Sequence, residues 1–366
     1  MRTRRAGFGQ LTNTGKQQHF ELGQWLRQRY TGFLPEKYSL NDIYVRSTDV
    51  DRTLMSAESN LAGLYSPIGT DVWDTNLKWQ PIPVHTLPEK SDAILSGKKH
   101  CARYKMEKDK LIHNEEFKRI NQQLKPLYEY ATNHSGKVIH DLQELEYLYN
   151  TLFIENLYKF QLPAWTRDIF PEKMAPWAHL SFEIDCYTST MQRLKVGLLM
   201  NEVFTRMQNK TKKLLVPDRK MWIYSAHDTT VANVLMALGA FEPHCPPYRS
   251  MILLELRHSV KLGYYVSAFY KNSSIPRPIS IKGCDLQCPL DTVLELMDPI
   301  MLTSPEWEDE CGTLPATLVS LVAFYAVMSL GILILLLWVS RCIETACAKR
   351  QQTRNQLYQP LNDEIN

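Results

Sequence analysis

Two short apolar segments each end in residues that could handle a phosphoryl group. Residues 43–45 lead into Arg46, and residues 220–225 lead into His227 and Asp228. An arginine is always charged and can bind two phosphate oxygens at once, and a histidine beside it can donate to a third. An aspartate in the first turn of a helix could hold or deliver a proton to a leaving oxygen.

The position of these residues fits a ligand site, but it also fits simpler roles. In open α/β sheets, ligands bind outside the carboxyl ends of the strands, where Arg46 and His227 are expected. Asp49 and Asp228, however, are equally well placed to cap the helices that follow them. Arg46 could form an ordinary surface ion pair. Spacing alone therefore does not choose between a phosphate site and these structural roles.

The elements that would carry these residues alternate between short strands and helices. A strand at 43–46 precedes a helix at about 50–64, and a strand at 220–225 precedes a helix that Gly239 ends. Residues 251–271 resemble an antiparallel pair, and the polar stretch 101–190 has leucines at helical spacing. The pattern predicts an α/β sheet with helices on both faces and a smaller helical insertion. The predicted parts are 1–100 and 191–311 for the α/β domain and 101–190 for the insertion.

One segment is typical of a membrane span. Residues 316–339 carry no charge and are long enough to cross a bilayer as a helix, so a buried core helix is the weaker interpretation. Acidic residues precede the segment and basic residues follow it. The positive-inside rule then places residues 340–366 in the cytosol as a tail. This predicts a type I single-pass protein at the cell surface or in lysosomes or endosomes.

The N-terminus does not match that topology. Residues 1–18 are basic but contain no apolar core, so they are not a signal peptide, although a transit peptide stays open. A large body outside the cytosol normally needs a signal. We therefore expect the start of this chain to be missing or alternative.

Composition and short motifs support an extracytosolic body. The net charge of +3 over 366 residues gives no basic footprint for nucleic acid. Glycosylation sequons occur at Asn133, Asn209 and Asn272. Cysteines that could pair in an oxidising compartment precede the span, and "GCDLQCP" fits a short disulfide loop or half of a zinc site.

Five separated blocks resemble one family. They are "GFGQLTNTGKQQHFELGQWLRQRY", "YVRSTDVDRTLMSAESNLAGLYSP", "WQPIPVHTLP", "LLVPDRKMWIYSAHDTTVANVLMAL" and "GCDLQCPL". In collinear order over about residues 7–311, they resemble the animal histidine acid phosphatases of the lysosomal, prostatic and testicular group. The resemblance implies a phosphoglycerate-mutase-like sheet with a helical insertion. It also implies hydrolysis of phosphate monoesters through a phosphohistidine, with no metal and no cofactor.

The resemblance assigns roles to the residues with which we began. Arg46 and His227 match the phosphate-binding arginine and the second histidine, and Asp228 matches the proton donor of the leaving group. It also implies two disulfides, Cys101–Cys311 and Cys284–Cys288, and a homodimer. Cys186 and Cys245 match no family pair and could form a bridge or stay free. The tail contains "YQPL", Tyr358 to Leu361, which is similar to a sorting signal read by adaptors.

The family's nucleophile motif, Arg-His-Gly-x-Arg-x-Pro, does not occur in this sequence. In the family it follows a central first strand that precedes the "GFGQLT" block, and Arg257-His258 is the only Arg-His pair here. Two hypotheses follow. The chain belongs to an acid phosphatase whose start is absent, or it is a catalytically inactive phosphatase-like single-pass membrane protein with a binding or trafficking role.

Overall fold

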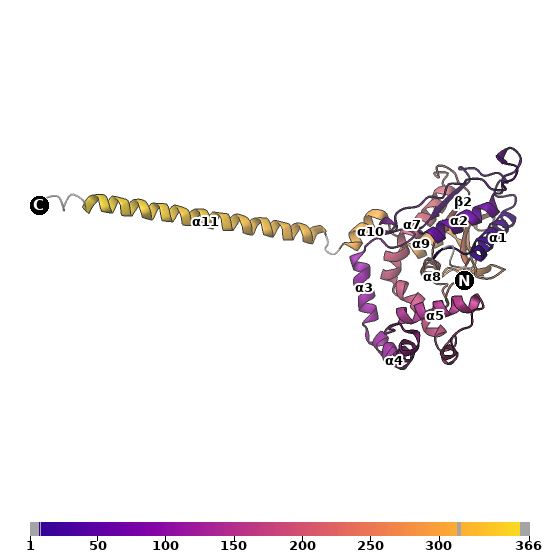
Figure 1. Ribbon diagram of the computed structural model, residues 1–366. Helices are drawn as coiled ribbons and strands as arrows, with labels where there is room; N and C mark the ends of the chain where they lie inside the picture. The colour runs from indigo at the N-terminus through magenta and orange to yellow at the C-terminus, as the bar shows by residue number, and fades with distance from the viewer. Residues whose placement is uncertain (1–6, 8, 313–315, 359–366) are drawn as a thin grey trace. The chain divides into compact units, whose positions relative to one another are not determined.

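The computed structural model describes residues 7, 9–312 and 316–358. They form two compact units, residues 1–311 and residues 312–366. The first unit mixes helices and strands, as the sequence predicts (Figure 1). Its helices are α1 Asn13–Arg29, α2 Asp51–Leu64, α3 Ala102–Ile112, α4 Glu115–Ser135, α5 Leu142–Leu157, α6 Ala175–Glu183, α7 Ser189–Thr211, α8 Asp228–Ala237, α9 Leu290–Met297 and α10 Ser304–Cys311. Short 3-10 turns cover Gly69–Asp71, Glu89–Ser91, Ala164–Asp168 and Ile184–Cys186.

The strands form two sheets within this unit. Strands β1 Ile43–Ser47 and β2 Met221–Ser225 pair in parallel, with Arg46 opposite Tyr224. Strands β3 Met251–Ser259 and β4 Gly263–Lys271 form the expected antiparallel pair, extended by β5 Arg277–Ile279 and β6 Cys288–Pro289. Parallel pairing places the carboxyl ends of β1 and β2 at one edge.

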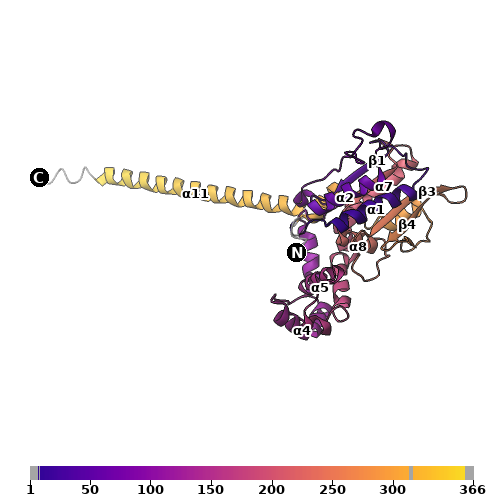
Figure 2. The same cartoon turned by 45° about the vertical axis from the view of Figure 1, so that its right-hand side comes forward.

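The same two layers of helices cover both sheets. On one face, Leu26 of α1 and Leu61 of α2 pack with Val45 of β1 and Leu253 of β3. On the other face, residues of α7, α8 and α9 pack against partly buried side chains of β2 and β3, among them Tyr224. Figure 2 shows α1 and α2 beside β1, β3 and β4. The two sheets therefore lie in one layer between two layers of helices, which confirms the predicted fold class.

Two glycines let α1 and α2 approach each other closely. A Cβ atom on Gly23 would lie 1.9 Å from the carbonyl oxygen of Asn60. A Cβ atom on Gly63 would lie 2.0 Å from the carbonyl oxygen of Phe20. Since a real side chain cannot occupy that space, the glycines fix the helix crossing that carries the first turn of α2 to the strand ends.

The region 101–190 is helical, as predicted. Leu142, Leu145 and Leu152, three of the leucines at helical spacing on α5, are buried in a core shared with α4 and α6. Disulfides join Cys101 to Cys311 and Cys284 to Cys288. Because Cys284 and Cys288 are bonded to each other, they do not form half of a zinc site. Cys186 and Cys245 are free thiols, so the bridge between them is not formed. The division of the first unit at residues 100 and 190 stays a prediction.

Strands β1 and β2 differ in how completely they are enclosed. Four of the five β1 residues are buried, and His85 bridges to Arg46 on the side away from β2. All five β2 residues are only half-buried. Within the part of the chain that the structure describes, β2 pairs with β1 alone and β3 pairs with β4 alone. Each of β2 and β3 therefore has one edge without a partner strand among these residues.

The second unit contains one long helix, α11 Ala316–Tyr358. Residues Ala323–Asn355 are long and apolar enough to cross a membrane by length and composition. The helix begins where the predicted span begins and continues through much of the predicted tail. Tyr358 is the last residue of the helix, and Leu361 of the predicted sorting signal lies outside the described residues.

Candidate active site

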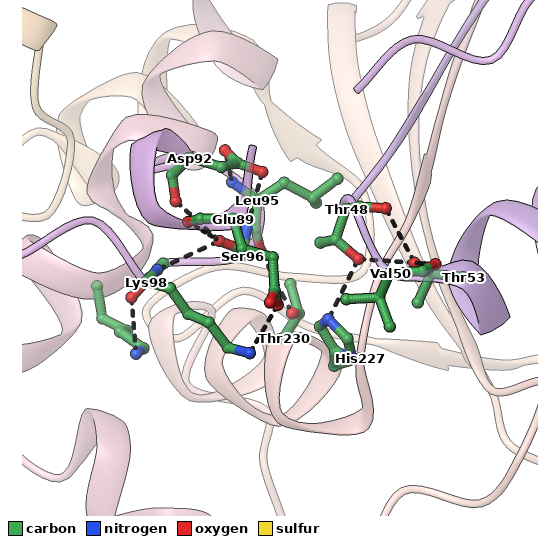
Figure 3. Close-up of polar contacts among 12 residues, drawn as sticks. Thr48, Val50, Thr53, Glu89, Asp92, Leu95, Ser96, Lys98, His227 and Thr230 are labelled. Carbon is green, nitrogen blue, oxygen red and sulfur yellow. Dashed lines mark hydrogen bonds and ion pairs between the residues drawn. The ribbon is translucent and has the colours of Figure 1, made fainter. Parts of the chain in front are cut away.

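The edge where β1 and β2 end brings several of the predicted residues together. His227 is the residue before α8, and its extended backbone turns the chain from β2 into that helix. The Nε2 atom of His227 lies 3.1 Å from the Oγ1 atom of Thr48, which follows β1 (Figure 3). The imidazole is therefore held against the end of the neighbouring strand.

Thr48 links the two strand ends through its backbone as well as its side chain. Its N–H donates to the carbonyl oxygen of Ser225 at 3.1 Å. Its hydroxyl also lies 2.8 Å from the hydroxyl of Thr53 in the first turn of α2. Thr48 and Thr53 are both almost fully buried. The Thr48 hydroxyl that contacts the His227 ring is therefore itself held in place by β2 and by the first turn of α2.

Arg46 is buried at the end of β1, so it does not form the surface ion pair that the sequence left open. Only 8% of the residue is exposed, and its Nη2 atom donates to the Oδ1 atom of Asp92 at 2.6 Å. Asp92 is fully buried and also accepts the backbone N–H groups of Ile94 and Leu95. The Nε atom of Arg46 is buried and has no acceptor among the described residues. An oxyanion would satisfy this donor.

Charges of both signs lie near His227. Burial lowers the pKa of His227 most, the cations Arg52 and Lys98 lower it further, and the carboxylates of Asp228 and Glu89 oppose them. Arg52 lies in the first turn of α2, and Lys98 forms an ion pair with Glu89 at 2.6 Å. A negatively charged phosphate would reverse this effect, because it would favour the protonated imidazole.

Asp228 is exposed at the start of α8, and among the described residues it has no ion-pair partner. It is the first helical residue, not the residue that caps the helix, and its Oδ1 atom accepts the N–H of Thr229 at 2.8 Å. Asp49 is also exposed, and Val50 precedes α2 without a side-chain cap. The capping role that the sequence left open for both aspartates is therefore not what the structure shows. Asp228 is free to meet a ligand.

A second carboxyl group lies near Asp228, on α5. Only 5% of Glu146 is exposed, and its carboxylate accepts hydrogen bonds from the amide side chains of Gln143 and Asn150. Burial and, to a smaller extent, the charge of Asp228 together raise the pKa of Glu146 from 4.5 to about 7. Cys245 faces the same two carboxyl groups, and burial raises the pKa of its thiol to about 12. The charge of Glu146, on a helix of the region 101–190, is thus coupled to the charge of Asp228 at the start of α8.

Sequence reasoning did not find Asp92, Arg52, Lys98 or Glu146. Arg52 follows "RSTDVD" directly, and its place in the first turn of a helix that begins at the strand end could have indicated a role. Asp92 and Lys98 lie in a loop without periodicity. Glu146 interrupts a run of apolar residues on α5, which in the sequence looks like an exposed position.

Comparisons with known proteins bear on the family and the fold of the chain. The family model "Histidine phosphatase superfamily (branch 2)" matches residues 4–271. Prostatic acid phosphatase of Mus musculus is 39% identical over 313 residues, covering 83% of this chain and 81% of the mouse protein. Lysosomal acid phosphatase of Homo sapiens is 36% identical over 311 residues, covering 83% of this chain and 73% of the human protein. The apo form of Hafnia alvei phytase matches with a TM-score of 0.62 at 16% identity over 82% of this chain and 88% of the phytase, a likeness of fold alone.

Proposed function

Because the chain belongs to the histidine phosphatase superfamily (branch 2), we propose that its strand-end site binds the phosphoryl group of a phosphate monoester. The observation that carries this proposal is the buried Nε donor of Arg46, which has no acceptor among the described residues. A buried donor without an acceptor costs free energy, and an oxyanion would remove that cost. In this role Arg46 and His227 hold the non-bridging oxygens.

Asp228 is the proton donor of the proposed reaction. Its exposed carboxyl group at the start of α8 can approach the leaving oxygen, and a proton delivered there lets an alcohol depart without negative charge. Arg52 adds a second positive charge next to His227, where the charge of the transferring group develops.

The covalent step needs a nucleophile that this sequence does not supply. No Arg-His-Gly tripeptide occurs in it, and Arg257-His258, its only Arg-His pair, lies on β3, where His258 is exposed and packs against Tyr264. We therefore propose that the chain as printed binds phosphate but does not form a phosphohistidine. With a segment carrying the nucleophile it would be an acid phosphatase. Without one it would be a phosphatase-like membrane protein that only binds.

Binding of inorganic phosphate to the full chain, measured by calorimetry at acid pH, tests the proposed site. His227→Gln and Arg52→Gln should each weaken binding by about 10- to 150-fold, since a hydrogen bond to a charged group contributes about 1.5–3 kcal/mol. Arg257→Gln on β3 is the matched control and should leave the affinity unchanged. Equal affinity in all of these variants would contradict the assignment.

We also propose the membrane topology and trafficking role that the sequence predicts. Lysosomal acid phosphatases are among the relatives, and part of α11 is long and apolar enough to span a membrane. In a type I arrangement the sequons at Asn133, Asn209 and Asn272 would face the lumen, and Asn133 and Asn272 are exposed. Treatment with an endoglycosidase that removes N-linked glycans should lower the apparent mass of the expressed protein on a gel, and an unchanged mass would count against this arrangement.

The proposed sorting signal and homodimer need separate tests. Tyr358→Ala should increase the share of the protein at the cell surface if an adaptor reads Tyr358 to Leu361. An unchanged distribution would reject the signal. The homodimer that the family resemblance implies is tested by the mass of the purified protein in solution.

A further inference from the structure

A cavity lies between α1 and the loop that follows β4. Its volume is about 630 Å³, which is within the range of small-ligand sites. Trp25, Gln28 and Arg29 line it from one face of α1, because residues three and four positions apart share a helix face. Phe269 of β4 and residues 274–276 line it from the other side. None of these residues belongs to the strand-end site.

The aromatic walls of this cavity are held in place by an arginine. The Cζ atom of Arg29 lies 5.5 Å from the ring centroid of Trp25 and 4.8 Å from that of Phe269. Its Nε and Nη2 atoms donate to the Oε1 atom of Glu255 at 3.0 and 2.8 Å. The Nζ atom of Lys271 lies 5.3 Å from the ring centroid of Trp25. The rings are therefore fixed before a ligand arrives, which lowers the ordering cost of binding.

The loop that lines the cavity carries one of the glycosylation sequons. Asn272 is exposed and precedes Ser274 by two residues, so their Cα atoms lie at most about 7 Å apart. The ammonium group of Lys271 donates to the carbonyl oxygen of Ser273, and the hydroxyl of Ser273 donates to the carbonyl oxygen of Ile275 at 3.2 Å. These bonds close the loop on itself. A group attached to Asn272 therefore begins beside the cavity.

The lining of the cavity suits an N-acetylated sugar. Such a sugar has an apolar face of C–H groups and an acetyl methyl group, with hydroxyl and amide groups around them. The aromatic rings from α1 and β4 match the apolar face, and the side chains of Gln28 and Arg29 can donate to the polar groups. Ile275 is a large apolar residue that is 77% exposed, and a sugar in the cavity would cover it.

We propose that this cavity holds the first sugars of a glycan attached to Asn272. A tethered sugar needs little affinity of its own, because a short tether keeps it at a high effective concentration. The inference rests on the luminal position of the first unit that is proposed above. It does not depend on phosphate binding.

Enzymatic release of the glycan from the folded protein tests this proposal. The full chain is produced in animal cells behind a cleavable signal peptide, so that Asn272 meets the glycosylation machinery. Peptide:N-glycosidase converts each released asparagine to aspartate, which mass spectrometry detects site by site. In Trp25→Leu, release from Asn272 should become about three- to tenfold faster, because the ring that stacks on the sugar is lost. Release from Asn133 in the same digest should not change.

Three further variants separate the cavity from the general stability of the loop. Trp25→Phe keeps a ring for stacking and should keep most of the slow release. Ile275→Ser removes an exposed apolar side chain from the cavity wall, should fold normally, and should also speed release from Asn272. Val260→Ser is the matched control, because Val260 is a fully exposed apolar residue between β3 and β4, and it should leave the rate unchanged.

Three results would overturn the proposal. Asn272 without a glycan would do so and would leave the proposed topology untouched, because the added signal peptide supplies entry to the lumen. A rate of release that neither Trp25→Leu nor Ile275→Ser changes would mean that the glycan extends into solvent. Equal acceleration by Trp25→Leu and Trp25→Phe, or by Ile275→Ser and Val260→Ser, would mean that stacking in the cavity does not set the rate.

Discussion

The ends of β1 and β2 meet at one site but are built differently. At the end of β1, Arg46 is buried, bonded to the fully buried Asp92, and flanked by β2 and by His85. At the end of β2, His227 is half-buried and Asp228 is exposed, and one edge of the strand has no partner among the described residues. The side chains at the end of β1 are held by buried contacts, whereas those at the end of β2 are accessible to solvent and to a ligand.

This difference follows from how each charge is satisfied. A buried ion pair with further hydrogen bonds holds its members in one place, because losing either partner leaves a buried charge. An exposed carboxylate is solvated by water and can exchange water for a ligand at little cost. In the proposed function, the β1 end would therefore position a phosphoryl group, and the β2 end would provide the groups that change protonation.

The largest expected effect is a difference in stability between variants of the buried Asp92 and of the exposed Asp228. Asp92→Ala should lower the free energy of unfolding by about 3–5 kcal/mol, because it leaves Arg46 buried without its partner. Asp228→Asn should change it by less than about 0.5 kcal/mol, since that side chain is exposed. Urea unfolding of the full chain measures both. Equal losses of unfolding free energy in the two variants would show that the two strand ends do not differ in this way.

The next effect is the loss of stability when an apolar side chain of β1 or of β2 is shortened. Val45 is 2% exposed, so Val45→Ala should cost about 2–4 kcal/mol. Ile223 is half-buried, and Ile223→Ala should cost roughly half as much, although its side chain is larger. The same denaturation experiment applies. A larger loss at Ile223 would show that β2 is as enclosed as β1 in solution.

The raised pKa of Glu146, which lies near Asp228, should make the stability of the protein depend on pH. Its pKa is raised from 4.5 to about 7, so the folded state holds a proton that the unfolded state has released over this range. Stability should therefore fall as pH rises from about 4.5 to 7. Glu146→Gln should remove this fall and stabilise the protein at pH 7.5 on the order of 2 kcal/mol. No difference between the two proteins in unfolding experiments at pH 4.5 and 7.5 would contradict the buried carboxyl.

The smallest effect concerns the charges around His227. Arg52→Gln should move the pKa of His227 back up toward 6.5, because one of the cations that lower it is gone. Because the folded pKa is lowered, His227 costs stability as pH falls through 6.5, and this loss should shrink in the variant. NMR titration of the imidazole measures the shift, with Arg257→Gln as the control. An unchanged pKa would place Arg52 too far from the ring to act.

The main elements and two of the strand ends were predictable from local pattern. Apolar runs that end in Arg46 and His227 indicated strands, and the polar residues marked their carboxyl ends. Asp92 was not predictable, because it reaches Arg46 from 46 positions away through a loop without periodicity. Glu146 was missed because its burial comes from tertiary packing, which the helical pattern of α5 does not encode.

The enclosure of β2 is a second feature that the sequence did not reveal directly. The apolar residues of 221–224 predict a buried strand, yet the structure leaves them half-exposed. The apolar pattern of a strand indicates that its side chains are suited to burial. It does not indicate which other elements cover those side chains.

Hydrolysis of an aryl phosphate at acid pH tests the central claim most directly. It should be measured for the chain as printed and for the same chain preceded by a strand that ends in Arg-His-Gly-x-Arg-x-Pro. We predict no turnover for the first and clear turnover for the second, where Asp228→Asn should reduce kcat by about 10²–10⁴-fold. Turnover by the printed chain alone, or full activity of the Asp228→Asn variant, would contradict a site that is divided between two strand ends and needs a nucleophile from a third.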